Sequence, residues 1–121
     1  SWMVTFLAPA KLLYSYLESG LDSQITFIGS AIAESQPDPR AASYCAGKHA
    51  LRGLVTTVQG EYPGRDIRLF SPGYINPDLL PKNAAVRQNE VILEPLDVAR
   101  ELVKWLAEPC DDPHRIFAPK P

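Results

Sequence analysis

The sequence predicts an α/β fold of three layers, in which helices cover both faces of a parallel sheet. Three short apolar runs rich in β-branched and aromatic residues predict strands, and the longer segments between them have helical periodicity. The order is helix, strand, helix, strand, helix, strand. Strands separated by helices of this length pair in parallel through right-handed crossovers. We expect a single domain over residues 1–121, because this length leaves little room for a second core.

The first helix is predicted within residues 4–18, which combine good helix formers with a set of leucines for a buried face. Pro9 is unfavourable in a helix interior. We therefore expect the helix to begin near Ala8, with Pro9 in its first turn. Gly20 follows at the position where a helix C-terminus favours glycine, so the helix should end there.

Two strands are expected on either side of a long helix. Residues 24–28 form a short β-branched and aromatic run that is typical of a buried strand, and residues 67–70 form a second one. Between them, residues 41–61 carry an apolar stripe at spacings of three and four, which indicates a helix. The Pro–Gly pair at positions 63 and 64 marks its end.

The last third of the chain is predicted to hold one helix and one strand. Residues 74–93 are irregular, and a helix is expected to start at Pro95, which suits a first-turn position. Residues 115–118 form the last short strand. A sheet of three strands is thin for this architecture, so one edge is expected to be exposed unless another segment or chain covers it.

Composition and charge argue against several classes of function. Apolar residues make up 45% and charged residues 21% of the chain, which is ordinary for a soluble globular protein. The formal net charge of −2 and the scattered basic residues give no reason to propose nucleic acid or a membrane surface as a partner. No apolar stretch approaches the roughly 20 residues that span a bilayer. Cys45 and Cys110 have no metal-ligand spacing, so we expect no metal site and a reducing, cytoplasmic location.

Three residues carry the candidate chemistry. Tyr44 and Lys48 lie four positions apart at the start of the predicted second helix, so both project from one face. A nearby ammonium lowers the pKa of a phenol, which can then exchange a proton during a carbonyl–alcohol interconversion. Ser30 follows the first strand, at the carboxyl end of the sheet where parallel α/β folds bind ligands. Taken alone, the Tyr-x-x-x-Lys match also fits a half-buried tyrosine with a solvated lysine.

The order of these features makes the pattern specific. A serine at a strand end, a loop, Tyr-x-x-x-Lys at a helix start and a strand that ends in Pro–Gly follow one another within residues 25–30, 42–54 and 66–76. In these segments, and through residues 95–99, the chain resembles the short-chain dehydrogenase/reductase family. The resemblance covers nearly the whole chain and implies a partial Rossmann-like fold, namely the C-terminal, catalytic half of that family's fold.

The resemblance implies a function and a set of roles. The protein would be an NAD(P)-dependent oxidoreductase that interconverts small-molecule carbonyls and alcohols. Tyr44 would be the general acid/base, Lys48 would lower its pKa and hydrogen-bond the nicotinamide ribose, and Ser30 would position the substrate carbonyl. Tyr44 and Lys48 would thus also contact the cofactor. Three residues after the second strand would form the wall beside the nicotinamide: Pro72, Gly73 and Ile75.

The chain departs from the family pattern in its phosphate-binding residues. None of its seven glycines forms the cluster of the family's first strand–turn–helix unit. The pyrophosphate of NAD or NADP would therefore not find the helix N-terminus to which it usually binds. We therefore expect the isolated chain to be inactive and to bind a dinucleotide poorly or not at all. Thr5 takes the position of an asparagine that supports the active-site lysine through water, and Pro77 that of a threonine that contacts the carboxamide.

Two interpretations follow from the sequence. The first is a fragment of an oxidoreductase that lacks the N-terminal half for dinucleotide phosphates. The second is a non-catalytic half fold that acts as a dimerising binding or assembly module. In the family, the helices that match residues 8–18 and 41–61 pack against a twofold mate, which implies a homodimer or homotetramer.

Overall fold

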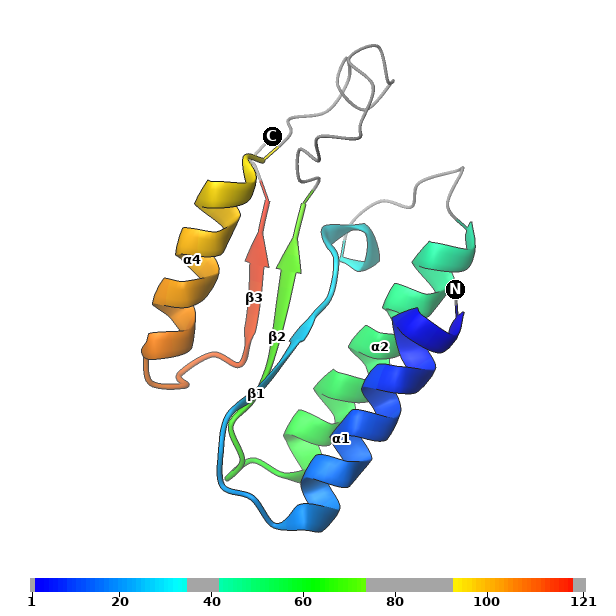
Figure 1. The fold of residues 1–121 in the computed structure, drawn as a ribbon, viewed down its shortest axis with the longest axis vertical. Helices are drawn as coiled ribbons and strands as arrows, with labels where there is room; N and C mark the ends of the chain where they lie inside the picture. The colour runs from blue at the N-terminus through cyan, green and yellow to red at the C-terminus, as the bar shows by residue number, and fades with distance from the viewer. Residues whose placement is uncertain (1, 35–41, 74–92, 119–121) are drawn as a thin grey trace.

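A computed structural model describes residues 2–34, 42–73 and 93–118 of the chain. The helices and strands alternate in the predicted order, with two short helical segments, η1 and η2, in addition (Figure 1). The elements are η1 (Met3–Leu7), α1 (Ala8–Ser19), β1 (Ile25–Ile28), η2 (Ala31–Ala33), α2 (Ala42–Glu61), β2 (Ile67–Pro72), α4 (Pro95–Ala107) and β3 (His114–Phe117).

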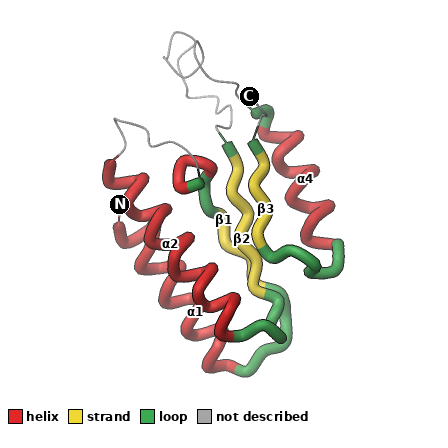
Figure 2. Tube along the Cα trace, turned by 180° about the vertical axis from the view of Figure 1, so that it is seen from behind, coloured by secondary structure: helices red, strands yellow, loops and turns green. Residues whose placement is uncertain are grey.

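The strands form one parallel sheet in the order β1-β2-β3. Ile25 pairs with Ile67 at the start of β1, and Leu69 pairs with His114 at the start of β3. Helices α1 and α2 cover one face of this sheet and α4 covers the other, as Figures 1 and 2 show. The predicted three-layer α/β fold, a partial Rossmann-like fold, is confirmed.

The handedness of the connections differs from the expectation. The chain moves in one direction across the sheet, while its two connecting helices, α2 and α4, lie on opposite faces. Two such crossovers must have opposite hands, so the prediction of right-handed crossovers is wrong for one of them. The rule holds for about 98% of such connections, so exceptions are rare. Between β2 and α4 the chain has residues 73–94, which is enough length to reach the far face of the sheet.

The main core lies between the two N-terminal helices and one face of the sheet. Its buried side chains are Leu13, Tyr16, Phe27, Leu51, Val55, Val58, Ile67 and Leu69. A smaller core on the opposite face joins Phe70 to Val98 and Trp105 of α4. Successive residues of a strand point to opposite faces, so β2 is buried along its whole length between the two cores.

The first helix continues upstream of the point where we expected it to begin. The α-helical part does start at Ala8 with Pro9 in its first turn, but a π-helical turn, Met3–Leu7, precedes it. Proline has no N–H and its ring clashes with the carbonyl four residues earlier, here that of Thr5. The wider π-helical turn relieves this conflict, and the Ala8 N–H donates to the Met3 carbonyl, five residues back.

The end of α1 agrees with the prediction, whereas the burial of β1 agrees only in part. Gly20 ends α1 in the left-handed conformation, with φ of 70°, as its position predicted. Strand β1 is only partly buried, because it pairs with β2 on one side and, among the described strands, with none on the other. Phe27 is buried, but 45% of Ile28 is exposed, so the expectation of a buried strand is wrong for Ile28.

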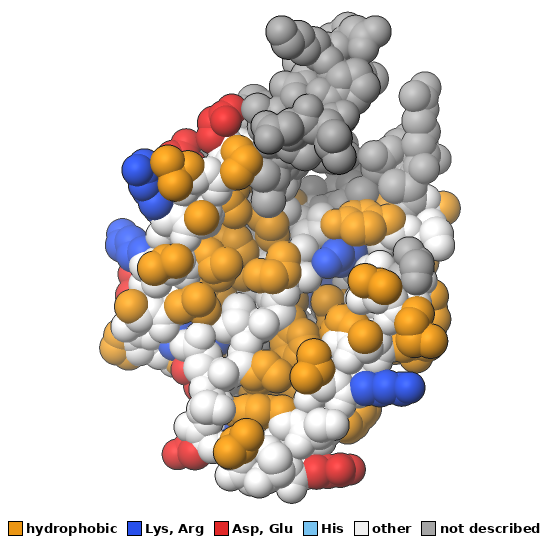
Figure 3. Space-filling model, in the orientation of Figure 1, with side chains coloured by type: hydrophobic (Ala, Val, Ile, Leu, Met, Phe, Trp, Pro, Cys, Tyr) orange, Lys and Arg blue, Asp and Glu red, His pale blue; other side chains and the backbone are white. Residues whose placement is uncertain are grey.

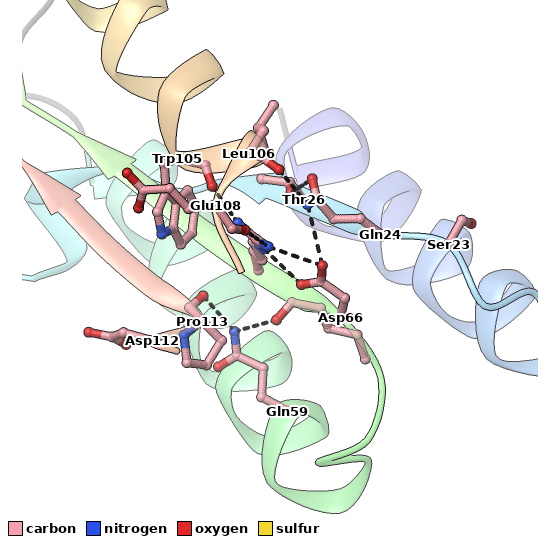
Figure 4. Close-up of polar contacts among 12 residues, drawn as sticks. Ser23, Gln24, Thr26, Gln59, Asp66, Trp105, Leu106, Glu108, Asp112 and Pro113 are labelled. Carbon is pink, nitrogen blue, oxygen red and sulfur yellow. Dashed lines mark hydrogen bonds and ion pairs between the residues drawn. The ribbon is translucent and has the colours of Figure 1, made fainter. Parts of the chain in front are cut away.

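A buried arginine that the sequence analysis did not single out joins the sheet to α4. Arg68 is 2% exposed, and its guanidinium donates to the carboxylate of Asp66, with Nε 2.8 Å from Oδ1. It also donates to the carbonyls of Trp105 and Glu108 at the C-terminal end of α4. Figure 4 shows this cluster, in which the Gln24 side chain also contacts Asp66. The charge is tolerated inside because a carboxylate and the negative end of a helix face it.

No helix in the described ranges is both long and apolar enough to cross a membrane.

Candidate active site

The carboxyl ends of the strands form one edge, and most of the predicted site residues lie along it. Ser30 stands two residues after β1, and the Gly29 N–H donates to the Phe70 carbonyl at 2.7 Å, which keeps the chain beside β2 as it leaves the strand. Pro72 ends β2 and is buried, and the Gly73 N–H donates to the Phe117 carbonyl at 2.9 Å. Ile75 lies outside the described residues.

Tyr44 and Lys48 occupy the first two turns of α2, as predicted. The Lys48 Nζ lies 5.6 Å from the centre of the Tyr44 ring and donates to the Ile28 carbonyl at 2.8 Å. Lys48 therefore connects the start of α2 to the end of β1, two residues before Ser30. Burial lowers the pKa of Lys48, because a charged ammonium loses part of its hydration there.

The Tyr44 ring lies at the surface, with 45% of the residue exposed. Tyr44 is therefore open to solvent, whereas Lys48 is half-buried beside it. This pairing of an exposed tyrosine with a partly desolvated cation can exchange a proton with a bound substrate and stabilise the negative charge that develops on the phenol oxygen.

A close contact between helices supports the same turn of α2. A Cβ added at Gly47 would lie 2.6 Å from Cγ2 of Thr5, which is closer than any real carbon contact. Gly47 thus allows η1 to approach the turn of α2 that separates Tyr44 from Lys48. Thr5, which the family resemblance implied to stand in place of an asparagine near the lysine, lies against α2 at Gly47.

Sequence reasoning missed Glu34, the last residue described before the loop to α2. Its side chain is 6% exposed and contacts Arg52 of α2, Ser71 of β2 and His114 of β3. The partners are 18, 37 and 80 residues away in the chain, so no local spacing reveals them. One signal for Glu34 was present in the sequence, namely that an acidic residue follows β1 at the carboxyl edge of the sheet, where parallel α/β folds bind ligands.

Among the described residues, His, Cys, Asp and Glu form no group of three that could hold a metal ion. The visible face in Figure 3 carries hydrophobic side chains over α4 and over the helices on the other side of the sheet. A shallow groove between α1 and α2 is lined partly by Tyr14, Leu17, Leu54 and Tyr62. Apolar surface of this kind is suited to contact with another protein surface.

Several solved structures similar to this chain are named as dehydrogenases. A dehydrogenase/reductase from Sinorhizobium meliloti has 28% sequence identity and a TM-score of 0.75, over 97% of this chain and 51% of that one. 4-Hydroxyisoleucine dehydrogenase, complexed with NADH and succinate, has 25% identity and a TM-score of 0.69, over 95% of this chain and 54% of that one. A short chain dehydrogenase from Burkholderia cenocepacia, in complex with NADP, has 23% identity and a TM-score of 0.63, over 82% and 45%.

No protein-family model matches the sequence, and no curated protein sequence matches it. The chain spans about half the length of the solved structures that it matches. The resemblance to the short-chain dehydrogenase/reductase family is thereby confirmed at the level of structure, and the chain has the fold of about half of such a protein.

Proposed function

We propose that this chain is the proton-transfer half of an NAD(P)-dependent oxidoreductase of the short-chain dehydrogenase/reductase type, which interconverts carbonyls and alcohols. The observation that carries the proposal is the position of Lys48, which lies beside the Tyr44 ring and bonds the end of the strand that leads to Ser30. The similarity to dehydrogenases whose structures hold NADH or NADP supports NAD or NADP as the cofactor.

The described residues fit the nicotinamide end of such a cofactor. Tyr44, which is exposed, would offer its hydroxyl and Lys48 its ammonium as partners for a ribose, and Pro72 and Gly73 lie at the end of the neighbouring strand. The glycine cluster that would hold the pyrophosphate is absent from the sequence. When bound, the cofactor supplies the hydride, and the protein supplies orientation and the proton.

The roles of the chain's own residues follow from their positions. Tyr44 gives its phenolic proton to the carbonyl oxygen during reduction and takes a proton from the alcohol during oxidation. Lys48, with its Nζ 5.6 Å from the centre of the ring, stabilises the negative charge that remains on the Tyr44 oxygen. Ser30 donates a hydrogen bond to the same substrate oxygen and holds it in place. The hydrogen bond from Lys48 to the Ile28 carbonyl holds the start of α2 against the end of β1.

A titration of the chain with the two ends of the cofactor tests this proposal. Nicotinamide mononucleotide should shift the NMR signals of residues 30, 44–48 and 72–73 at millimolar concentration, and adenosine monophosphate should not. Lys48→Met should abolish the response, whereas Lys104→Met, which changes an exposed lysine of α4, should leave it intact. Equal responses to both nucleotides, or none to either, would contradict the assignment. Micromolar binding of intact NADH would show that the missing half is not required.

A second candidate function is a dimerising half fold without catalysis. Leu12 and Tyr14 of α1 are 63% and 54% exposed, which favours contact with another apolar surface. In this form, residues 8–18 and 41–61 would build a homodimer or homotetramer. Analytical ultracentrifugation distinguishes the oligomer from a monomer, and a stable, well-folded monomer would count against this candidate. For either candidate we expect a single domain in the cytoplasm, in keeping with Cys45 and Cys110, which form no disulfide.

A further inference from the structure

The carboxylate of Glu34 lies between α2 and the sheet, although it belongs to the loop that leaves β1. Its side chain is 6% exposed, and it follows Ser30 by four residues. A carboxylate at this depth is unfavourable unless charged or hydrogen-bonding partners surround it. Its surroundings therefore show what holds this loop in place.

Three different elements supply those partners. Glu34 Oε2 accepts from Arg52 Nε of α2 at 2.9 Å. Glu34 Oε1 lies 3.3 Å from Ser71 Oγ of β2, which donates to it, and 2.9 Å from His114 Nε2 of β3. A carboxylate only accepts, so the histidine nitrogen that faces it carries the proton. One side chain thus joins the loop to α2 and to two strands.

The turn between Ser30 and Glu34 is itself closed by backbone hydrogen bonds. The Ala33 N–H donates to the Ser30 carbonyl at 3.0 Å, and the Glu34 N–H donates to the Ala31 carbonyl at 2.9 Å. At the other end, a Cβ on Gly29 would lie 2.7 Å from Ser71 Oγ, so the absence of a side chain there gives the Ser71 hydroxyl its space. A displacement of Glu34 would therefore be transmitted to Ser30.

The helix that holds Glu34 is the helix that carries the tyrosine and the lysine. Arg52 follows Lys48 by four residues, one turn further along α2. The Glu34–Arg52 ion pair and the bond from Lys48 to the Ile28 carbonyl therefore hold the segment around Ser30 to α2 at two points, one on each side of the serine.

We propose that Glu34 is a positioning residue that fixes the turn carrying Ser30 against the helix carrying Tyr44 and Lys48. This inference rests on the proposed function, because the geometry that it preserves is that of the proton-transfer site. Glu34 does not contact the substrate. It acts by holding the serine hydroxyl at a constant place relative to the phenol.

Amide hydrogen exchange of the intact chain tests the proposal in Glu34→Ala and Glu34→Gln. In Glu34→Ala, the amides of residues 33 and 34 should exchange about tenfold faster or more, because the turn loses its attachment to three elements. In Glu34→Gln the increase should be smaller, because the single amide oxygen can still accept from Arg52 or from Ser71, which bond different oxygens of the glutamate. The Leu69 amide, which donates to the Pro113 carbonyl in the core, should keep its protection in both variants.

Glu101→Gln is the matched control, because it breaks another carboxylate–arginine pair, with Arg115 on the opposite face of the sheet. It should leave the amides of residues 33 and 34 unchanged. Unchanged exchange in Glu34→Ala would overturn the proposal. An equal acceleration at residues 33, 34 and 69 would also overturn it, since Glu34 would then support the whole fold and not this turn.

Nicotinamide mononucleotide separates this proposal from the proposed function. In Glu34→Ala, the ligand-induced shift of the Ser30 signal should be reduced while those of Tyr44 and Lys48 persist, and Glu34→Gln should restore part of the Ser30 response. An unaltered Ser30 shift in Glu34→Ala would contradict the positioning role. If the wild-type chain shows no response at all, the proposed function fails, while the exchange result still decides whether Glu34 holds the turn.

Discussion

Gly47 offers the sharpest test of the packing around the candidate site. An alanine there would place its Cβ 2.6 Å from Thr5 Cγ2 and 3.0 Å from Thr5 Cβ, whereas carbon atoms in contact lie about 3.5–4.0 Å apart. Thr5 belongs to a helical turn and its side chain is branched at Cβ, so it has few rotamers into which it could move. The helices must therefore separate, or one of them must bend.

The magnitude follows from two opposing effects. Overpacking of this kind costs about 1–3 kcal/mol of folding free energy. Replacing a glycine by alanine in a helix interior contributes about 1 kcal/mol in the favourable direction. Gly47→Ala should therefore leave the free energy of unfolding unchanged or lower it by up to about 2 kcal/mol. Gly53→Ala, in the same helix with no atom within 4 Å of the added carbon, should raise it by up to about 1 kcal/mol.

Urea unfolding of the wild type and both variants, followed by circular dichroism, measures this difference. The double variant Thr5→Ala/Gly47→Ala provides the decisive comparison, because it removes the Cγ2 atom that the new Cβ would meet. In the Thr5→Ala background, Gly47→Ala should cost about 1 kcal/mol less than in the wild type. If Gly47→Ala is as stabilising as Gly53→Ala, the close approach of η1 and α2 is not as described here.

Three further variants test the charged groups. Arg68 holds the pKa of Asp66 below its ordinary value of 3.8, mainly through the hydrogen bond to its carboxylate. The folded state therefore binds fewer protons there, and this contribution to stability is complete above pH 3.8 and lost as pH falls through the folded pKa. In Asp66→Asn, the free energy of unfolding measured in urea should depend less on pH below 3.8 than in the wild type. The same pH dependence in both proteins would contradict the link between Asp66 and Arg68. Arg68→Met should lower the free energy of unfolding by about 3 kcal/mol, at the low end for a broken buried pair because Asp66 remains partly exposed. A loss below about 1 kcal/mol would place this arginine among ordinary surface charges. Lys48→Met should change stability by less than about 1 kcal/mol, since the bond to Ile28 and the desolvation of the ammonium offset each other. A large loss of stability in this variant would assign Lys48 a structural role in place of a catalytic one.

Local patterns in the sequence predicted much of the fold. The apolar stripe of α2 and the glycine at the end of α1 each depend on residues within a few positions, and both are found as expected. The spacing of Tyr44 and Lys48 is also local, because one helical turn brings the two side chains together wherever the helix lies.

Features that depend on distant partners could not be predicted in this way. The burial of Arg68 requires two carbonyls of α4, 37 and 40 residues away, and the contacts of Glu34 extend over 80 residues. The exposure of Ile28 is set by the absence of a neighbouring strand among the described residues, which no property of the run itself reveals. The π-helical turn before Pro9 depends both on the local clash of the proline ring and on the packing of Thr5 against Gly47 of α2. The second contact cannot be predicted from neighbouring residues.

The side of β1 that pairs with no other strand within residues 2–34, 42–73 and 93–118 has a consequence for how the chain behaves in concentrated solution. A strand edge that pairs with no other described strand is a template for another strand, although its Ile28 carbonyl already accepts from Lys48, and the apolar side chain of Ile28 adds to the attraction. Because β1 has only four residues, such a junction would be short and reversible. Self-association of the purified chain should therefore begin with pairing at this sheet edge. Ile28→Lys should reduce it and keep the chain monomeric.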